Sequence, residues 1–244
     1  IQDNFQKIDI KSLNIKELPE LERYILHKIF TLDLNYKENL KNYNFHKLYK
    51  ELLNFCTLDL SSFYFDIRKD VLYCDSVNSK KRKNCIIVLN ILLDCLLKWF
   101  APILVFTTDE IFDLVNKSGG SIHEQNFVDI PKKWKNESLN NKWTNLLKIK
   151  QEANIAIEEQ RIKKTIGSSL EAALTIKINE NSYKLLEGLD LAEYFITSKA
   201  EKIKLDEKSE TRIEVKKANG EKCPRCWKIL ENKCDRCKEV TSAI

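Results

Sequence analysis

The sequence predicts a mainly α-helical protein, in which an antiparallel helical bundle precedes a long helix, a small α+β unit and a C-terminal four-cysteine knuckle. Gly and Pro number only 9 among 244 residues, where average usage gives about 29. β-Sandwiches, β-barrels and doubly wound nucleotide-binding folds need many glycines for turns and phosphate loops, so these classes are disfavoured for most of the chain. Over roughly the first 118 residues, apolar side chains recur at helical spacing between short connections, which favours an antiparallel bundle.

Two helices are expected at the start of this bundle. Residues 18–42 carry apolar side chains three and four positions apart, which predicts a helix. Asn44 is the expected N-cap of a second helix, whose apolar face continues to Phe63. We expect the stretch from Asp66 to Ser79 to break that helix.

Ser79 is the expected cap of a third, very apolar helix. From Cys85 to Phe106, 18 of 22 residues are apolar, which is close to the length of a membrane span. A membrane helix is disfavoured, because Asp94 and Lys98 form an i,i+4 pair suited to an exposed stripe on a bundle helix and costly in lipid. We therefore expect no membrane association.

The rest of the bundle is expected to be short and irregular. Pro102 interrupts the apolar helix before a fourth helix, which the capping box Thr107-x-x-Glu110 opens and Ser118-Gly119-Gly120 stops. Residues 122–134 have no regular pattern and predict a strap that crosses the bundle.

The second half predicts a long helix and a small α+β unit. Ser138 is the expected cap of the helix, and Gly167 its left-handed C′ residue. Alternating strand patterns cover 173–178 and 212–215, with a short helix at 185–195 between them. The expected domains are a bundle with its strap at 1–135, a helix and α+β junction at 136–219, and a cysteine tail at 220–244.

The tail carries the motif with the clearest chemistry. Cys223, Cys226, Cys234 and Cys237 form two C-x-x-C pairs that are seven residues apart. Four thiolates close a tetrahedral site around one structural Zn²⁺ ion, which would supply folding energy to a segment with few apolar residues. Two disulfides or a redox C-x-x-C are the alternatives; no thioredoxin-like βαβ pattern surrounds the pairs. Without a secretory signal pattern, a reducing cytoplasmic setting is the default.

Charge alone says little about a nucleic-acid partner. The chain has 41 basic and 36 acidic residues, and residues 220–244 have six and four, so a tail loaded with a Zn²⁺-tetrathiolate group of charge −2 is nearly neutral. Arg225, Arg236 and Trp227 would have to carry RNA binding, although packing against the knuckle explains Trp227 equally well. The basic run 80–83 is interpreted as a solvated surface, and no His has a neighbour that indicates chemistry.

Several motifs, in order, resemble the C-terminal part of bacterial-type isoleucyl-tRNA synthetases, namely their anticodon-binding helical domain and zinc-binding tail. They are Asn54–Tyr64 with Asp66–Cys74, Ala101–Leu104 with Phe106–Ile111, Ile166–Ala172, and Cys223–Trp227. The resemblance covers about residues 18 to 240. Valine and leucine enzymes share the helical bundle, but the run at 166–172 and the four-cysteine knuckle are similar to the isoleucine enzymes.

The resemblance implies a class I ligase, monomeric and cytoplasmic, that joins isoleucine to tRNA(Ile) using ATP and Mg²⁺. The family's His-x-Gly-His and Lys-Met-Ser-Lys-Ser signatures are absent here, since no His is followed two residues later by Gly and the chain has no Met. We therefore expect the catalytic and editing domains, with ATP and Mg²⁺, to lie before Ile1, and this portion to be inactive alone.

The resemblance implies that this portion docks the anticodon stem-loop. Trp227 with Arg225 is the preferred pair for loop bases, Arg236 is a further candidate, and Arg68 and Lys69 are candidate phosphate contacts. The seven-residue gap between the cysteine pairs is shorter than the family's usual spacing, so some loop contacts are expected to be missing.

A free-standing zinc-ribbon helical protein that binds another RNA or a protein is the competing hypothesis. An upstream reading frame with the catalytic signatures favours the ligase, and an initiator codon just before Ile1 favours the competitor.

Overall fold

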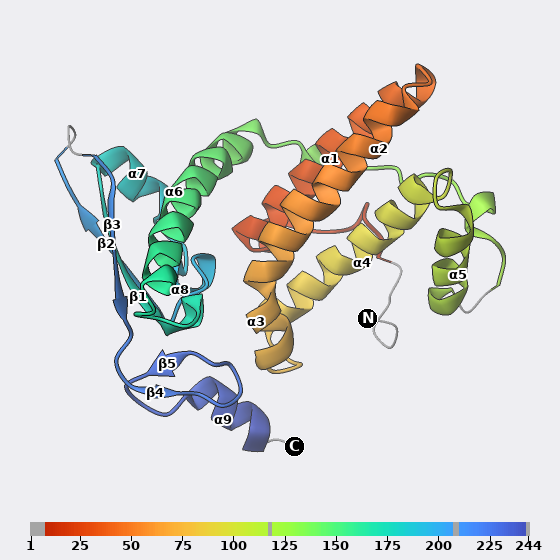
Figure 1. Ribbon diagram of the computed structural model, residues 1–244. Helices are drawn as coiled ribbons and strands as arrows, with labels where there is room; N and C mark the ends of the chain where they lie inside the picture. Colours follow the sequence, from red (N-terminus) through yellow and green to blue (C-terminus); the bar gives the residue numbers. More distant parts are fainter. Residues whose placement is uncertain (1–7, 117–118, 207–209, 243–244) are drawn as a thin grey trace. The chain divides into compact units, whose positions relative to one another are not determined.

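The computed structural model describes residues 8–116, 119–206 and 210–242 (Figure 1). Contacts divide these residues into two compact units. The helical unit contains the residues up to Ser61 together with Val77–Asn136, and the mixed unit contains Ser62–Ser76 together with the residues from Glu137 onward. Residues 62–76 and the cysteine tail both group with Glu137 and the residues that follow it. The division into domains at 1–135, 136–219 and 220–244 stays a prediction.

The helical unit is built from four α-helices and a strap. The helices are α1 (Glu20–Lys41), α2 (Phe45–Asn54), α4 (Lys80–Phe100) and α5 (Val105–Val115), and short 3-10 turns lie at η2 (Ile15–Glu17), η4 (Ile122–Glu124) and η5 (Lys132–Trp134). Its core is mainly apolar but also encloses polar side chains such as Glu22 and Asp33. The Tyr36 hydroxyl donates a hydrogen bond to the carbonyl of Trp99 at 3.0 Å. Phe127 and Trp134 anchor the strap: Phe127 packs edge-on against Tyr36, and Trp134 is buried. The prediction of a mainly helical fold is confirmed.

The polar stripe on α4 is less exposed than predicted. Lys98 and Asp94 form the expected ion pair at 2.8 Å, but the Lys98 side chain is only 12% exposed. The Cys95 thiol lies near both the Asp94–Lys98 pair and the Asp33–Lys37 pair of α1. The polar stripe of α4 therefore faces charged groups of α1. Burial also raises the pKa of the Cys95 thiol. Among the described helices, none is both long and apolar enough to cross a bilayer.

The expected break at Asp66 is wrong. After α2 the chain continues as the π-helical segment η3 (Phe55–Phe65) and then as α3 (Asp66–Cys74). Ile67, Val71 and Cys74 are buried and lie four and three residues apart, so a helical stripe runs between the charges of this stretch. The helix ends before Asp75.

The expected caps have mixed outcomes. The Ser79 hydroxyl accepts a hydrogen bond from the Arg82 amide at 3.4 Å, which confirms that cap. The capping box at Thr107 is wrong, because α5 already begins at Val105, after an N-cap without a side-chain hydrogen bond. The helix ends at Val115; Ser118 of the predicted stop lies outside the described residues.

The mixed unit combines the longest helix with a three-stranded sheet. Its elements are α6 (Glu137–Ile162), η6 (Ser169–Glu171), β1 (Ala172–Ile178), α7 (Glu180–Leu185), α8 (Leu191–Tyr194), β2 (Lys199–Lys204) and β3 (Arg212–Lys217). The strand order is β2-β1-β3, with β2 parallel and β3 antiparallel to β1. The sequence did not indicate β2, because this edge strand is rich in lysine. The single helix expected at 185–195 is wrong, because α7 ends at Leu185 and the next helix, α8, covers only Leu191–Tyr194.

The predicted ends of the long helix are also wrong. Helix α6 includes Ser138 in its first turn and ends at Ile162. Lys164, and not Gly167, has the left-handed conformation, with φ +58°. The amide of Gly167 instead donates to the Glu171 carboxylate at 2.9 Å.

Lys150 is a cation in the apolar core of the mixed unit. Its Nζ atom donates a hydrogen bond to the backbone carbonyl of Tyr194 at 2.5 Å. The same atom lies 5.2 Å from the centre of the Tyr194 ring. Burial lowers the pKa of Lys150 to about 8, and Asp66 opposes this shift. The charged form is therefore disfavoured in the folded state.

We expect Lys150→Met to remove a pH dependence of folding. The folded-state pKa lies below the unfolded value of 10.5, so the unfolded chain holds the proton more tightly and stability rises with pH between these values. From pH 7.5 to 9.5 the wild-type protein should gain about 2 kcal/mol relative to Lys150→Met in urea unfolding. Lys148→Met, at an exposed position two residues away, is the control. Parallel pH profiles for wild type and Lys150→Met would contradict this assignment.

Candidate metal centre

The four predicted cysteines converge in the structure. The tail forms β4 (Glu221–Lys222), β5 (Ile229–Leu230) and α9 (Asp235–Ser242), and the Sγ atoms of Cys223, Cys226, Cys234 and Cys237 all lie within 4.8 Å of one another. The Sγ atoms of Cys226 and Cys234 are 3.8 Å apart. A tetrahedron with metal–sulfur bonds of about 2.3 Å has edges of about 3.8 Å. All eight cysteines are free thiols, so the arrangement fits one metal ion and not disulfides.

Local backbone geometry orients the sulfurs. The amide of Trp227 donates to the carbonyl of Cys223 at 2.9 Å, which closes the first knuckle, and Cys234 leads directly into α9. Burial disfavours the Cys223 thiolate, but the amides of Cys226 and Arg225 donate to its sulfur, so its pKa falls to about 7. This sulfur is therefore readily ionised near neutral pH, which metal ligation requires.

Gly220 forms a sharp backbone turn at the start of the tail. Its φ is +119°, a conformation that side chains rarely permit, and a Cβ atom there would lie 2.1 Å from the carbonyl oxygen of Leu230. The glycine allows β4 to pair closely with β5, in the register Glu221 to Leu230.

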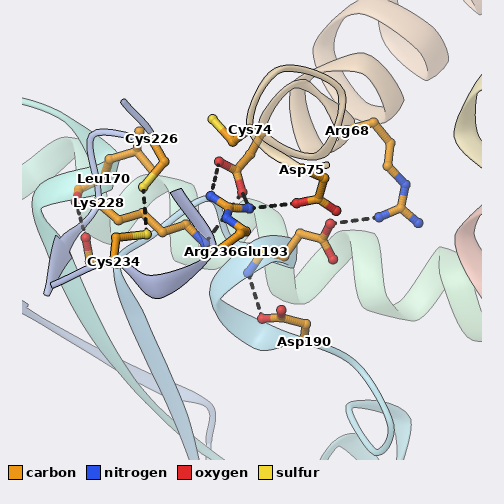
Figure 2. Close-up of polar contacts among 12 residues, drawn as sticks. Arg68, Cys74, Asp75, Leu170, Asp190, Glu193, Cys226, Lys228, Cys234 and Arg236 are labelled. Atoms are coloured by element: carbon orange, nitrogen blue, oxygen red, sulfur yellow. Dashed lines mark hydrogen bonds and ion pairs between the residues drawn. The ribbon is translucent and has the colours of Figure 1, made fainter. Parts of the chain in front are cut away.

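Arg225 and Arg236, both predicted to contact RNA, bind the tail to α3 and the residue that follows it. Arg236 makes a bidentate pair with Asp70 at 2.7 and 2.9 Å. It also contacts Asp75 at 3.1 Å (Figure 2). Arg225 donates to the carbonyls of Cys74 and Tyr73 at 2.5 and 2.9 Å. Burial raises the pKa of Asp70, but the hydrogen bonds and charge of Arg236 more than offset it, so the pKa is lowered. The sequence did not predict this structural role.

Arg68 is placed in the interior. Its side chain is 4% exposed, and Nη1 lies 2.9 Å from the Glu193 carboxylate, which is itself largely buried (Figure 2). Asp190 caps α8 at the amide of Glu193 and so orients this partner. The structure corrects the expectation for Arg68, because a side chain enclosed in this way does not reach a phosphate in solvent. The neighbouring Lys69 side chain is 65% exposed and pairs only at the surface, with Asp66.

Trp227 lies at the surface. It is 60% exposed and adopts φ +65°, and Lys222 Nζ lies 6.0 Å from the centre of its ring. The interpretation of Trp227 as packing is therefore wrong. Tyr73, whose carbonyl accepts from Arg225, is a second exposed aromatic residue, which the sequence analysis missed. Its position between Val71 and Cys74, off their buried stripe, is the signal that would have revealed it.

Comparison with known proteins gives consistent matches. Residues 22–178 match the family described as the anticodon-binding domain of tRNA ligase. The chain is 55% identical over 236 residues to an isoleucine–tRNA ligase of Pelagibacter ubique, covering 97% of this chain and 26% of that protein. For the isoleucine–tRNA ligase of Agrobacterium fabrum the identity is 40%, covering 87% of this chain and 23% of that protein. The isoleucine–tRNA ligase of Gluconobacter oxydans is 36% identical, and the match covers 96% of this chain and 25% of that protein. The chain spans about a quarter of the length of these relatives.

Proposed function

Because the chain belongs to the family of tRNA-ligase anticodon-binding domains, we propose that it docks the anticodon stem-loop of tRNA(Ile) within an isoleucine–tRNA ligase. The match over residues 22–178 carries this proposal, and the names of the relatives support the isoleucine assignment. The family resemblance inferred from the motifs is thereby confirmed. The competing free-standing zinc-ribbon protein has no counterpart among the three relatives described above.

The ligase reaction itself is assigned to residues outside this chain. The relatives are about four times as long, and neither catalytic signature occurs in these 244 residues. ATP and Mg²⁺ then belong to that catalytic part, and the complete enzyme is proposed to be a cytoplasmic monomer. This portion would contribute binding and orientation of the tRNA.

The metal is proposed to be one structural Zn²⁺ ion held by Cys223, Cys226, Cys234 and Cys237. The four sulfurs satisfy a tetrahedral ion, leaving no position for substrate. Bound zinc supplies the energy that folds the tail. The protein's own contribution is to fasten this tail to α3 through Arg225 and Arg236.

The exposed aromatic ring on the first knuckle is the proposed base contact. Trp227 presents its ring to solvent, and unpaired loop bases stack on such rings. Arg225 donates only to neutral carbonyl groups of α3, so its positive charge is proposed to support this contact. Arg236 is neutralised by Asp70 and Asp75 and is proposed to act by holding the tail, and Lys69 is proposed to contact a phosphate. Base stacking on an aromatic residue is worth about 1–3 kcal/mol.

We expect Trp227→Ala to weaken tRNA(Ile) binding about tenfold or more, because one stacking contact is lost. Trp227→Phe should keep most of the affinity, and the zinc content of both variants should equal that of the wild type. Phe106→Ala, which removes a strongly exposed ring of α5, is the matched control and should bind normally. Filter binding measures all four proteins. Equal affinity of Trp227→Ala and wild type would refute the stacking role.

A further inference from the structure

A basic groove lies within the mixed unit, where the three-stranded sheet meets the cysteine tail. It has a volume of about 610 Å³. Its lining includes Lys199, Lys216, Lys217, Asn219, Asn232 and Lys233. We call it the lysine groove. None of these residues was singled out by the sequence, because they come from two strands and the tail.

Strand register sets two of the lysines on one face. Lys199 of β2 and Lys216 of β3 both pair with Ala173 of the central strand β1. Paired residues of neighbouring strands point to the same face of a sheet, and the small Ala173 side chain leaves the space between the two lysines open. Ala173 therefore lies at the base of the groove, with Lys199 on one side and Lys216 on the other.

The tail side of the groove is hydrogen-bonded to the end of the sheet through Ser198. The Ser198 hydroxyl accepts a hydrogen bond from the Ile229 amide of β5 at 2.6 Å and donates to the carbonyl of Leu170. Gly220 provides the sharp turn between the sheet and the tail. Lys233 follows β5 in the chain and lines the groove from the tail side.

The charge of the groove is not balanced internally. Lys199, Lys216, Lys217 and Lys233 are exposed, and none forms an ion pair with another described residue. Glu231 and Asp235 also line the groove, and Arg236 is occupied by Asp70 and Asp75, so two positive charges remain in excess. Farther along the same face of the sheet, Lys177 pairs with Glu214. Unpaired cations therefore gather at the end of the sheet next to the tail.

We propose that the lysine groove binds the phosphate backbone of a single-stranded RNA segment; this rests on the proposed function. Lysine ammonium groups bind phosphates as point charges without reading the base. An open groove of about 610 Å³ admits a nucleotide, and the two asparagine side chains offer hydrogen bonds to ribose or phosphate oxygens. The groove would fix the path of the strand, while Trp227 contacts a base.

The test compares two doubly substituted proteins in the zinc-loaded state. Lys199→Gln with Lys216→Gln removes two charges from the groove, and Lys148→Gln with Lys163→Gln removes two exposed charges from the α6 region, outside the groove lining. Binding of a tRNA(Ile) transcript is titrated at several salt concentrations. At about 0.1 M salt the groove variant should bind about tenfold more weakly, and its slope of log K against log salt should fall by about 1 to 2. The control should match the wild type in both.

The outcomes separate the two proposals. If the wild-type protein fails to bind the transcript, the proposed function is wrong. If the wild type binds and the groove variant behaves like the control, the groove proposal alone is overturned. A loss of affinity without a change in salt slope would also overturn it, because phosphate contacts release counterions. Zinc content and near-ultraviolet circular dichroism should be unchanged in both variants.

Discussion

Cys234→Ser will lose the metal and unfold the tail, while the helical unit keeps its core. The described part of the tail has only a few buried side chains of its own, and two of these belong to the proposed ligands Cys226 and Cys237. Structural zinc contributes about 10–16 kcal/mol of apparent binding free energy at neutral pH, far more than this small segment gains by burial. The effect is therefore expected to be the largest of any single substitution considered.

Two measurements check this result. Metal analysis should give less than one zinc per chain for Cys234→Ser, and hydrogen exchange should show loss of protection at the amides of Trp227 and Lys238, which are bonded in the folded knuckles. Cys56→Ser, at a half-buried thiol outside the cluster, serves as the control and should keep the zinc. Retention of stoichiometric zinc by Cys234→Ser would exclude a four-thiolate site.

Arg68→Ala is expected to destabilise the mixed unit by about 3–5 kcal/mol. Removal of the guanidinium leaves Glu193 as a buried carboxylate without its cation, and breaking a buried ion pair costs this much. Lys69→Ala, at the next and exposed position, should cost less than about 0.5 kcal/mol. Denaturant unfolding of the two variants gives the comparison.

The same two variants also show whether Arg68 has a structural role in the interior or a role in binding RNA. A phosphate-binding role would lower the RNA affinity of Arg68→Ala without lowering its stability. An interior role lowers stability, and replacement of both partners, as in Arg68→Met with Glu193→Leu, should recover part of it because no buried charge is left alone. Equal stabilities of Arg68→Ala and Lys69→Ala would contradict the interior role.

Local sequence patterns predicted that the four cysteines of the tail come together. The spacing of Cys223, Cys226, Cys234 and Cys237 contains the geometry of the site, because each knuckle closes within a few residues. The long apolar helix and the Ser79 cap were likewise predictable from neighbouring residues. These features depend on contacts that are close in sequence.

The functions of the arginines were not predictable in the same way. Arg68 meets Glu193 across 125 positions, and Arg236 meets Asp70 across 166 positions. The local sequence does not distinguish a basic residue that pairs with a distant acidic residue from one that binds a phosphate. Trp227 is exposed and has φ +65°, and the run C-P-R-C-W specifies neither feature. Similarly, the lysine groove exists only once β2, β3 and the tail have been brought together.

The membership of α3 in the mixed unit has a consequence for synthesis on the ribosome. Arg68 and Asp70 are translated more than a hundred residues before Glu193 and Arg236, the groups that neutralise them. At about 5–20 residues per second, this interval is on the order of ten seconds. During that time Arg68 and Asp70 lack these two neutralising groups, and a chain that ended at residue 136 would never acquire them.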